Sequence, residues 1–90
     1  MANKRTLKRY INDSCADLLA ECVAVSLYGA SVSEEDTDAL LRSILKMESN
    51  YLSRISHPEP GMDEKKYFHI LIEDFHKDAN ELIDQINNLC

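Results

Sequence analysis

The sequence predicts an all-α fold, an up-down-up three-helix bundle that forms one domain over residues 1–90. Three observations predict it. Apolar residues recur every three or four positions in three long segments, which is the period of a helix. Short breaks that contain glycine, proline and serine separate these segments, and no segment alternates with the period of a strand. Long helices with short connections fold back as antiparallel neighbours.

The first helix is expected over about residues 3–28. Its apolar stripe consists of Leu7, Ile11, Cys15, Leu18, Cys22 and Val25. Gly29 follows at the position where glycine often ends a helix in the left-handed conformation. We therefore expect a left-handed cap at Gly29.

The second helix is expected over about residues 34–56. Ser33 precedes three acidic residues, and this order is typical of a helix start because the hydroxyl caps free N–H groups and acids favour the positive helix end. The apolar positions are Leu40, Leu41, Ile44, Leu45, Met47, Tyr51, Leu52 and Ile55.

The third helix is expected over about residues 63–89. The turn that precedes it is interpreted as structural and not as a ligand site. His57 and Glu59 each precede a proline, which restricts them to extended conformations, and Gly61 follows. The apolar stripe of the third helix consists of Phe68, Leu71, Phe75, Ala79, Leu82, Ile86 and Leu89.

The charge is acidic overall but basic at the start. The net charge is −6, and removing the +4 of the first turns leaves −10 on residues 10–90. Such an acidic body repels nucleic acid and anionic membranes. Nucleic-acid contact through the basic turns is therefore a weaker alternative function, and we expect Asp63 and Glu64 to lie near these turns and neutralise them. The basic residues are Lys4, Arg5, Lys8 and Arg9.

The cysteines and the apolar runs favour a bacterial cytoplasmic protein with no membrane segment. Cys15 and Cys22 lie about 10.5 Å apart along a helix, too far for a disulfide bond. Free thiols are typical of a reducing compartment. Residues Leu19–Cys22 resemble a lipidation signal, but Glu21 stands where a small residue is needed, and no run reaches the ~18 apolar residues that span a bilayer.

The first helix carries more apolar surface than a three-helix bundle needs, since small or apolar side chains cover roughly 220° of its circumference. Two interpretations stay open. The helix lies deepest and its own chain covers both sides, or the additional face binds a second copy or another protein. The residues of this face are Ala16, Ala20, Val23 and Leu27.

Glu73 and His76 form a Glu-x-x-His motif, and His69 precedes Glu73 by four residues, so these are the candidate metal ligands. Di-metal sites in helical bundles need two such motifs, and Glu73 projects away from the apolar stripe. We therefore interpret the three residues as a solvated edge. Glu48 projects into the middle of the second helix's apolar arc, where a neighbour such as Ser14, or a basic side chain, is expected to pair with it.

Four segments resemble a small uncharacterised family from Bacteroidetes: Asn3–Lys8, Ala20–Ala24, Ser26–Gly29 and Ser56–Met62. The resemblance covers most of the chain. It implies a short, all-helical cytoplasmic protein and no established activity, so it assigns no catalytic residue.

The sequence thus predicts a helical protein-interaction or assembly module, with no catalytic residue and no cofactor. A homodimer or another protein bound through the first helix is the expected partnership. The alternative is a metal-binding or enzymatic bundle that uses Glu73 and His76.

Overall fold

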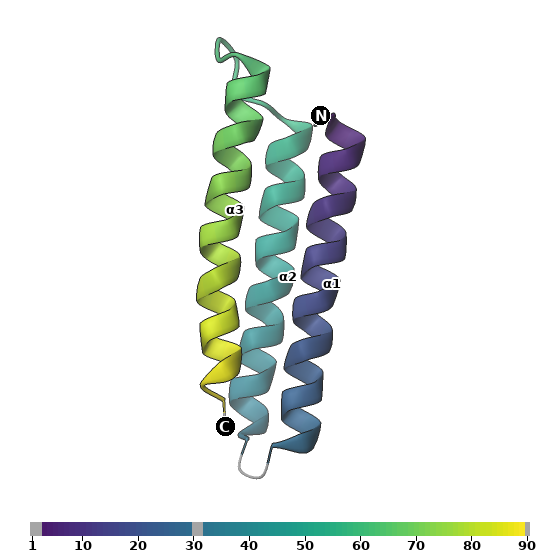
Figure 1. Ribbon diagram of the computed structural model, residues 1–90, viewed down its shortest axis with the longest axis vertical. Coiled ribbons are helices and arrows are strands. Elements are labelled where there is room, and N and C mark those ends of the chain that lie inside the picture. Colours follow the sequence, from purple (N-terminus) through teal and green to yellow (C-terminus); the bar gives the residue numbers. More distant parts are fainter. Residues whose placement is uncertain (1–2, 30–31, 90) are drawn as a thin grey trace.

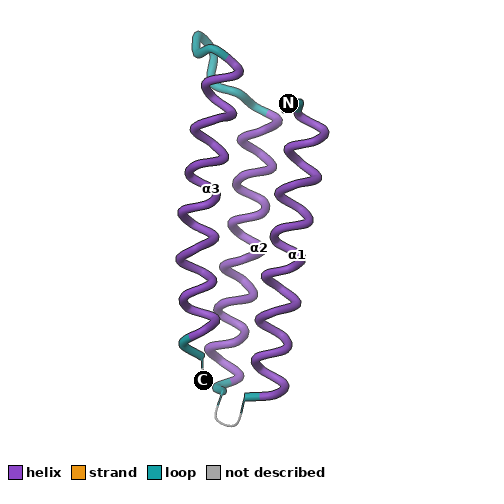
Figure 2. Tube along the Cα trace, viewed as in Figure 1, coloured by secondary structure: helices purple, strands orange, loops and turns teal. Residues whose placement is uncertain are grey.

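The computed structural model describes residues 3–29 and 32–89 and has the predicted all-α architecture. Helix α1 spans Lys4–Tyr28, α2 spans Glu34–Ser56 and α3 spans Glu64–Asn87. The three helices lie side by side, with α1 and α3 running in one direction and α2 in the other (Figure 1). The bundle measures 50 × 18 × 16 Å. The described ranges contain helices, loops and turns but no strand (Figure 2).

Each helix is preceded by an N-cap residue whose polar side chain accepts a hydrogen bond from the backbone N–H three residues further on. Ser33 is one of these caps, as predicted, and the other two occupy positions that the sequence placed inside helices. The bonds run from Thr6 N to Asn3 Oδ1 at 2.8 Å, from Asp36 N to Ser33 Oγ at 3.4 Å, and from Lys66 N to Asp63 Oδ2 at 3.3 Å.

The end of α1 differs from the prediction. Gly29 has φ −78° and ψ 137°, so it is extended, and the expected left-handed cap is wrong. The Gly29 N–H donates to the Val25 carbonyl at 2.8 Å, which satisfies that carbonyl without a left-handed residue. Helix α3 also ends earlier than predicted, at Asn87, where the N–H of Asn88 reaches several carbonyls of the last turn.

The left-handed glycine lies instead between α2 and α3. Gly61 has φ 85°, and the N–H of Met62 donates to the Glu59 carbonyl at 3.4 Å. With Pro60 before it, this is the arrangement of a type II turn, in which proline fixes one position and glycine accepts the positive φ of the next. The structural turn that the sequence predicted is present.

The core is built from one buried stripe on each helix, as the spacing predicted. Tyr51 and Phe75 are its largest fully buried side chains, and their rings meet edge to face with centroids 5.3 Å apart. The buried apolar residues are Leu7, Ile11, Cys15, Leu18, Cys22, Leu40, Ile44, Met47, Tyr51, Ile55, Phe68, Leu71, Phe75, Leu82 and Ile86.

The stripe of α2 is narrower than predicted. Leu45 is 50% exposed, and Leu41 and Leu52 are half-buried. The buried residues of α2 are Thr37, Leu40, Ile44, Met47, Tyr51 and Ile55, because two neighbouring helices cover only part of the α2 circumference.

Polar side chains close the seam between α2 and α3. The Tyr51 hydroxyl donates to Asp78, the Arg54 Nη2 lies 3.3 Å from Asp74 Oδ2, and the Tyr67 hydroxyl donates to the Arg54 carbonyl at 3.1 Å. Over residues 3–29 and 32–89, no side-chain hydrogen bond or ion pair crosses from α1 to α2. That seam is held by apolar contact.

Candidate functional site

The face of α1 that the sequence singled out is open to solvent. Ala16 and Ala20 are exposed, Val23 is 42% exposed and Leu27 is 71% exposed. Their spacing of four, three and four residues places them on one side of α1, opposite its buried stripe. The interpretation in which the chain itself covers this face is therefore wrong for these four side chains.

Helix α2 extends this apolar surface. Because α1 and α2 are antiparallel and the charge of Glu48 acts on the Cys15 thiol, these two residues lie at the same level of the bundle. Three residues before Glu48 on α2 correspond to three residues after Cys15 on α1, so Leu45 lies at the level of Leu18 and Leu19 along the bundle. The helical spacing places Leu45 on the outer side of the α1/α2 seam, where Leu19 and Leu41 are half-buried against the core.

We call this surface the outer apolar face. It consists of Ala16, Leu19, Ala20, Val23 and Leu27 of α1 with Leu41 and Leu45 of α2. The sequence does not reveal that Leu45 is a surface residue. The eight apolar positions of α2 form a wide band around the helix, and the pattern does not show which edge of this band the other helices cover. The spacing of Leu41, Leu45 and Leu52, one step beside the central stripe, is the signal that distinguishes them.

The outer apolar face has charges of opposite sign at its two ends. Arg5 and Arg9 precede Ala16 at helical spacing on α1, and Glu34 and Asp38 precede Leu45 at helical spacing on α2. All four charged residues are exposed. The first turns of α1 and α2 lie at opposite ends of the bundle (Figure 1). The exposed residues Asp13 and Arg42 follow these pairs at the same helical spacing and carry the opposite sign. The face therefore has a net charge of +1 at one end (two arginines and one aspartate) and −1 at the other (two acids and one arginine), with the apolar residues between them.

The basic turns are not neutralised as expected. Lys4, Arg5 and Arg9 are exposed, and Lys8 is half-buried. Among the residues that the structure describes, the ion pairs are Arg54–Asp74 and His69–Glu73, so none joins the basic turns to α3. Although both segments lie at the same end of the bundle, their charged side chains remain solvated.

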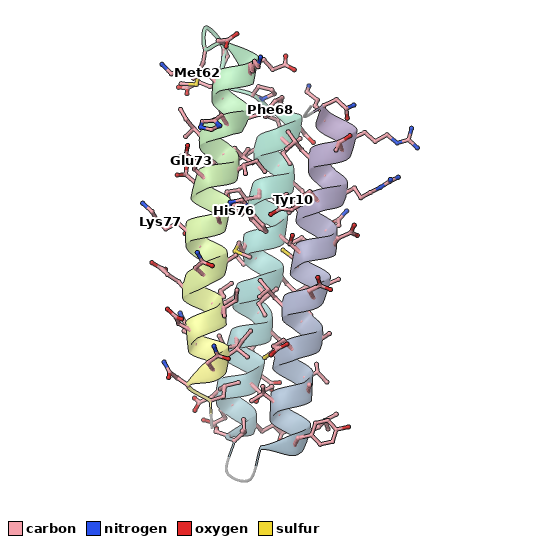
Figure 3. All side chains as sticks on the ribbon, in the orientation of Figure 1. Tyr10, Met62, Phe68, Glu73, His76 and Lys77 are labelled. Carbon is pink, nitrogen blue, oxygen red and sulfur yellow. The ribbon has the colours of Figure 1, made fainter. Side chains whose placement is uncertain are left out.

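The candidate metal ligands do not converge. His69 Nε2 lies 2.6 Å from Glu73 Oε1, with both side chains largely exposed. His76 instead points towards Tyr10 of α1, whereas Glu73 points away from the bundle (Figure 3). Over the described ranges, no three His, Cys, Asp or Glu side chains are placed to hold a metal ion.

Tyr10 and His76 close the seam between α1 and α3. The Tyr10 hydroxyl lies 2.6 Å from His76 Nε2, at one end of a groove of about 400 Å³ that also contains Ser14, Asp17 and Ile83. The sequence did not reveal this pair, because it depends on how α1 and α3 are rotated against each other. Its chemistry is that of a polar contact between two helices, like the contacts between α2 and α3.

Glu48 lies at the edge of the buried stripe of α2 and not in its middle. It is half-buried, and in the described part of the chain neither Ser14 nor a basic side chain is bonded to it, so the expected pairing is wrong. Since Leu45 is exposed, the true stripe is shifted away from Glu48. The carboxylate therefore keeps access to solvent.

The two thiols in the core are free, and burial favours their protonated form. Burial and the negative charge of Glu48 raise the pKa of Cys15 to about 11, and burial raises the pKa of Cys22. Cys15 and Cys22 are both buried and unbridged. They act as small core residues, which is the role predicted from the sequence.

Comparisons with protein-family models, with curated proteins and with solved structures find no match to this chain. The resemblance to a Bacteroidetes family therefore stays a prediction. Over the described residues, none of the three helices combines the length and the apolar content needed to cross a bilayer.

Proposed function

We propose that the protein is a helical interaction module without catalytic activity, which binds a protein partner through the outer apolar face. The exposure of Val23 and Leu27 on the outer side of α1, and of Leu45 beside the α1/α2 seam, is the observation that supports this function. Contiguous apolar surface of this kind is typical of interfaces. Covering it gains roughly 25 cal/mol per Å², less the entropy of association, so the expected affinity is modest.

The contrast between the three seams favours the same surface. The α2/α3 and α1/α3 seams have hydrogen bonds at their outer edges, whereas the outer edge of the α1/α2 seam has leucine and valine side chains. A further helix laid along this edge would extend the apolar core to the packing of a four-helix bundle. We place this interaction in the bacterial cytoplasm, where Cys15 and Cys22 would remain reduced.

Photo-cross-linking in the expressing cell tests the function. p-Benzoylphenylalanine introduced at Leu27 places the probe on the outer apolar face, and the same residue at Lys77 places it on the exposed side of α3. We expect discrete covalent adducts from position 27 and none from position 77. Adducts from neither position, or equal adducts from both, would show that the outer apolar face is not an interaction surface.

A further inference from the structure

We infer that the partner on the outer apolar face is a second copy of this chain, turned end for end. The two copies pair antiparallel about a two-fold axis that crosses the face between Ala16 and Ala20. This inference rests on the proposed function and specifies its partner.

Charge complementarity is the argument for this arrangement. The basic end of the face carries Arg5 and Arg9, and the acidic end carries Glu34 and Asp38. A two-fold axis perpendicular to the bundle brings the basic end of each copy towards the acidic end of the other. A parallel arrangement would place like charges together at both ends, which opposes association. The face is therefore electrostatically complementary to itself in the antiparallel arrangement alone.

Charge reversal tests the orientation. The variant Arg5→Glu/Arg9→Glu makes both ends of the face acidic, and Glu34→Lys/Asp38→Lys makes both ends basic. In sedimentation equilibrium near 0.1 M salt, we expect each variant alone to associate about tenfold more weakly than the wild type, because attraction becomes repulsion at both ends. An equimolar mixture should associate at least as tightly as the wild type. Circular dichroism melts check that both variants remain folded.

Other outcomes of this experiment contradict the inference. If the wild type associates but each variant alone associates equally well, the copies are not antiparallel. If the wild type is monomeric at all concentrations while Leu27 cross-links to other proteins, the function stands and the inferred partner is wrong. If the probe at Leu27 forms no adduct and the wild type is monomeric, both proposals fail.

A matched pair of single substitutions locates the contact on α1. Ala20 and Ala24 are both exposed, but only Ala20 belongs to the outer apolar face. Ala20→Glu places like charges close to the two-fold axis, so we expect it to abolish the dimer. Ala24→Glu should leave the dimer constant within about twofold of the wild type, as a surface change away from the contact does. Equal loss from both substitutions would place the contact elsewhere.

Disulfide trapping provides an independent test of orientation. In a Cys90→Ser background, we expect an oxidised mixture of the Asn12→Cys and Val23→Cys proteins to yield a disulfide between positions 12 and 23, which are both exposed. A disulfide between two copies of position 23 would show a parallel pair. A mixture that sediments as a dimer but yields no bond between 12 and 23 would also overturn the antiparallel arrangement.

Discussion

The Tyr10 hydroxyl of α1 lies 2.6 Å from Nε2 of His76 on α3. The same ring meets Phe75 edge-on, with centroids 6.0 Å apart. One side chain thus joins the first and last helices by a hydrogen bond at its tip and by apolar contact along its ring.

These two contributions can be separated by substitution. Because Tyr10 is 42% exposed, water can bond to His76 Nε2 once the hydroxyl is removed in Tyr10→Phe. We therefore expect this variant to lower the unfolding free energy by less than about 1 kcal/mol. Tyr10→Ala also removes the contact with Phe75 and should cost more. Urea unfolding measures both. Equal losses from the two variants would show that the hydroxyl and not the ring holds the helices together.

Two neighbouring residues of α2 test whether its buried stripe is as narrow as the structure shows. Ile44 is fully buried and Leu45 is 50% exposed. We expect Ile44→Ala to lower the unfolding free energy by about 2–4 kcal/mol through loss of burial and a cavity, and Leu45→Ala by less than about 1 kcal/mol. The measurement is urea unfolding at a concentration where the protein is monomeric. A large loss from Leu45→Ala under these conditions would place that side chain in the core.

The buried thiol of Cys15 predicts a loss of stability at alkaline pH. Its pKa is raised from 9.0 to about 11, so the folded protein binds this proton more tightly than the unfolded chain does. Stability from this group is complete below pH 9.0 and is lost as the pH rises towards about 11. We expect a decrease of about 1 kcal/mol near pH 10.

The variant Cys15→Ala isolates this effect. The pKa of Tyr51 is also raised, by burial and by its hydrogen bond to Asp78, so the wild type loses further stability at higher pH. The difference between the pH dependences of the wild type and Cys15→Ala reports the thiol alone. Parallel curves between pH 8 and pH 10 would mean that the thiol titrates at the same pH in both states.

The turn between α2 and α3 predicts a cost for any side chain at Gly61. Its φ of 85° strains L-residues, although no atom lies within 4 Å of an added Cβ. We expect Gly61→Ala to lower the unfolding free energy by about 1 kcal/mol through backbone strain alone. Gly29→Ala is the matched control, since Gly29 is extended and should tolerate alanine. Thermal melts of both variants decide between them.

The sequence predicts the helices well because periodic apolar residues report directly on burial. It does not determine which glycine becomes left-handed. Gly29 follows a helix in the usual position for such a cap, but the conformation at a helix end depends on the direction the chain must take next. Gly61 is left-handed because the proline before it already specifies a type II turn.

The candidate site was predictable only on α1. Ala16, Ala20, Val23 and Leu27 exceed what a helix with two neighbours can bury, and this excess is visible in the sequence. The contribution of Leu45 and the partner of His76 depend on how the helices are rotated about their axes. Apolar periodicity places the centre of each stripe but not the contacts on its flanks.

The polar flank of α3 that faces α2 also favours one handedness of the bundle. In an up-down-up bundle the third helix can pack on either side of the first two, and apolar stripes are compatible with both mirror-related topologies. With α3 on the opposite side, the flank of Asp74 and Asp78 would face α1, and the buried Tyr51 hydroxyl would lose its acceptor. An unsatisfied buried hydroxyl costs about 1–3 kcal/mol. Two carboxylates at the rim of the core therefore favour one of two folds that the core itself does not distinguish.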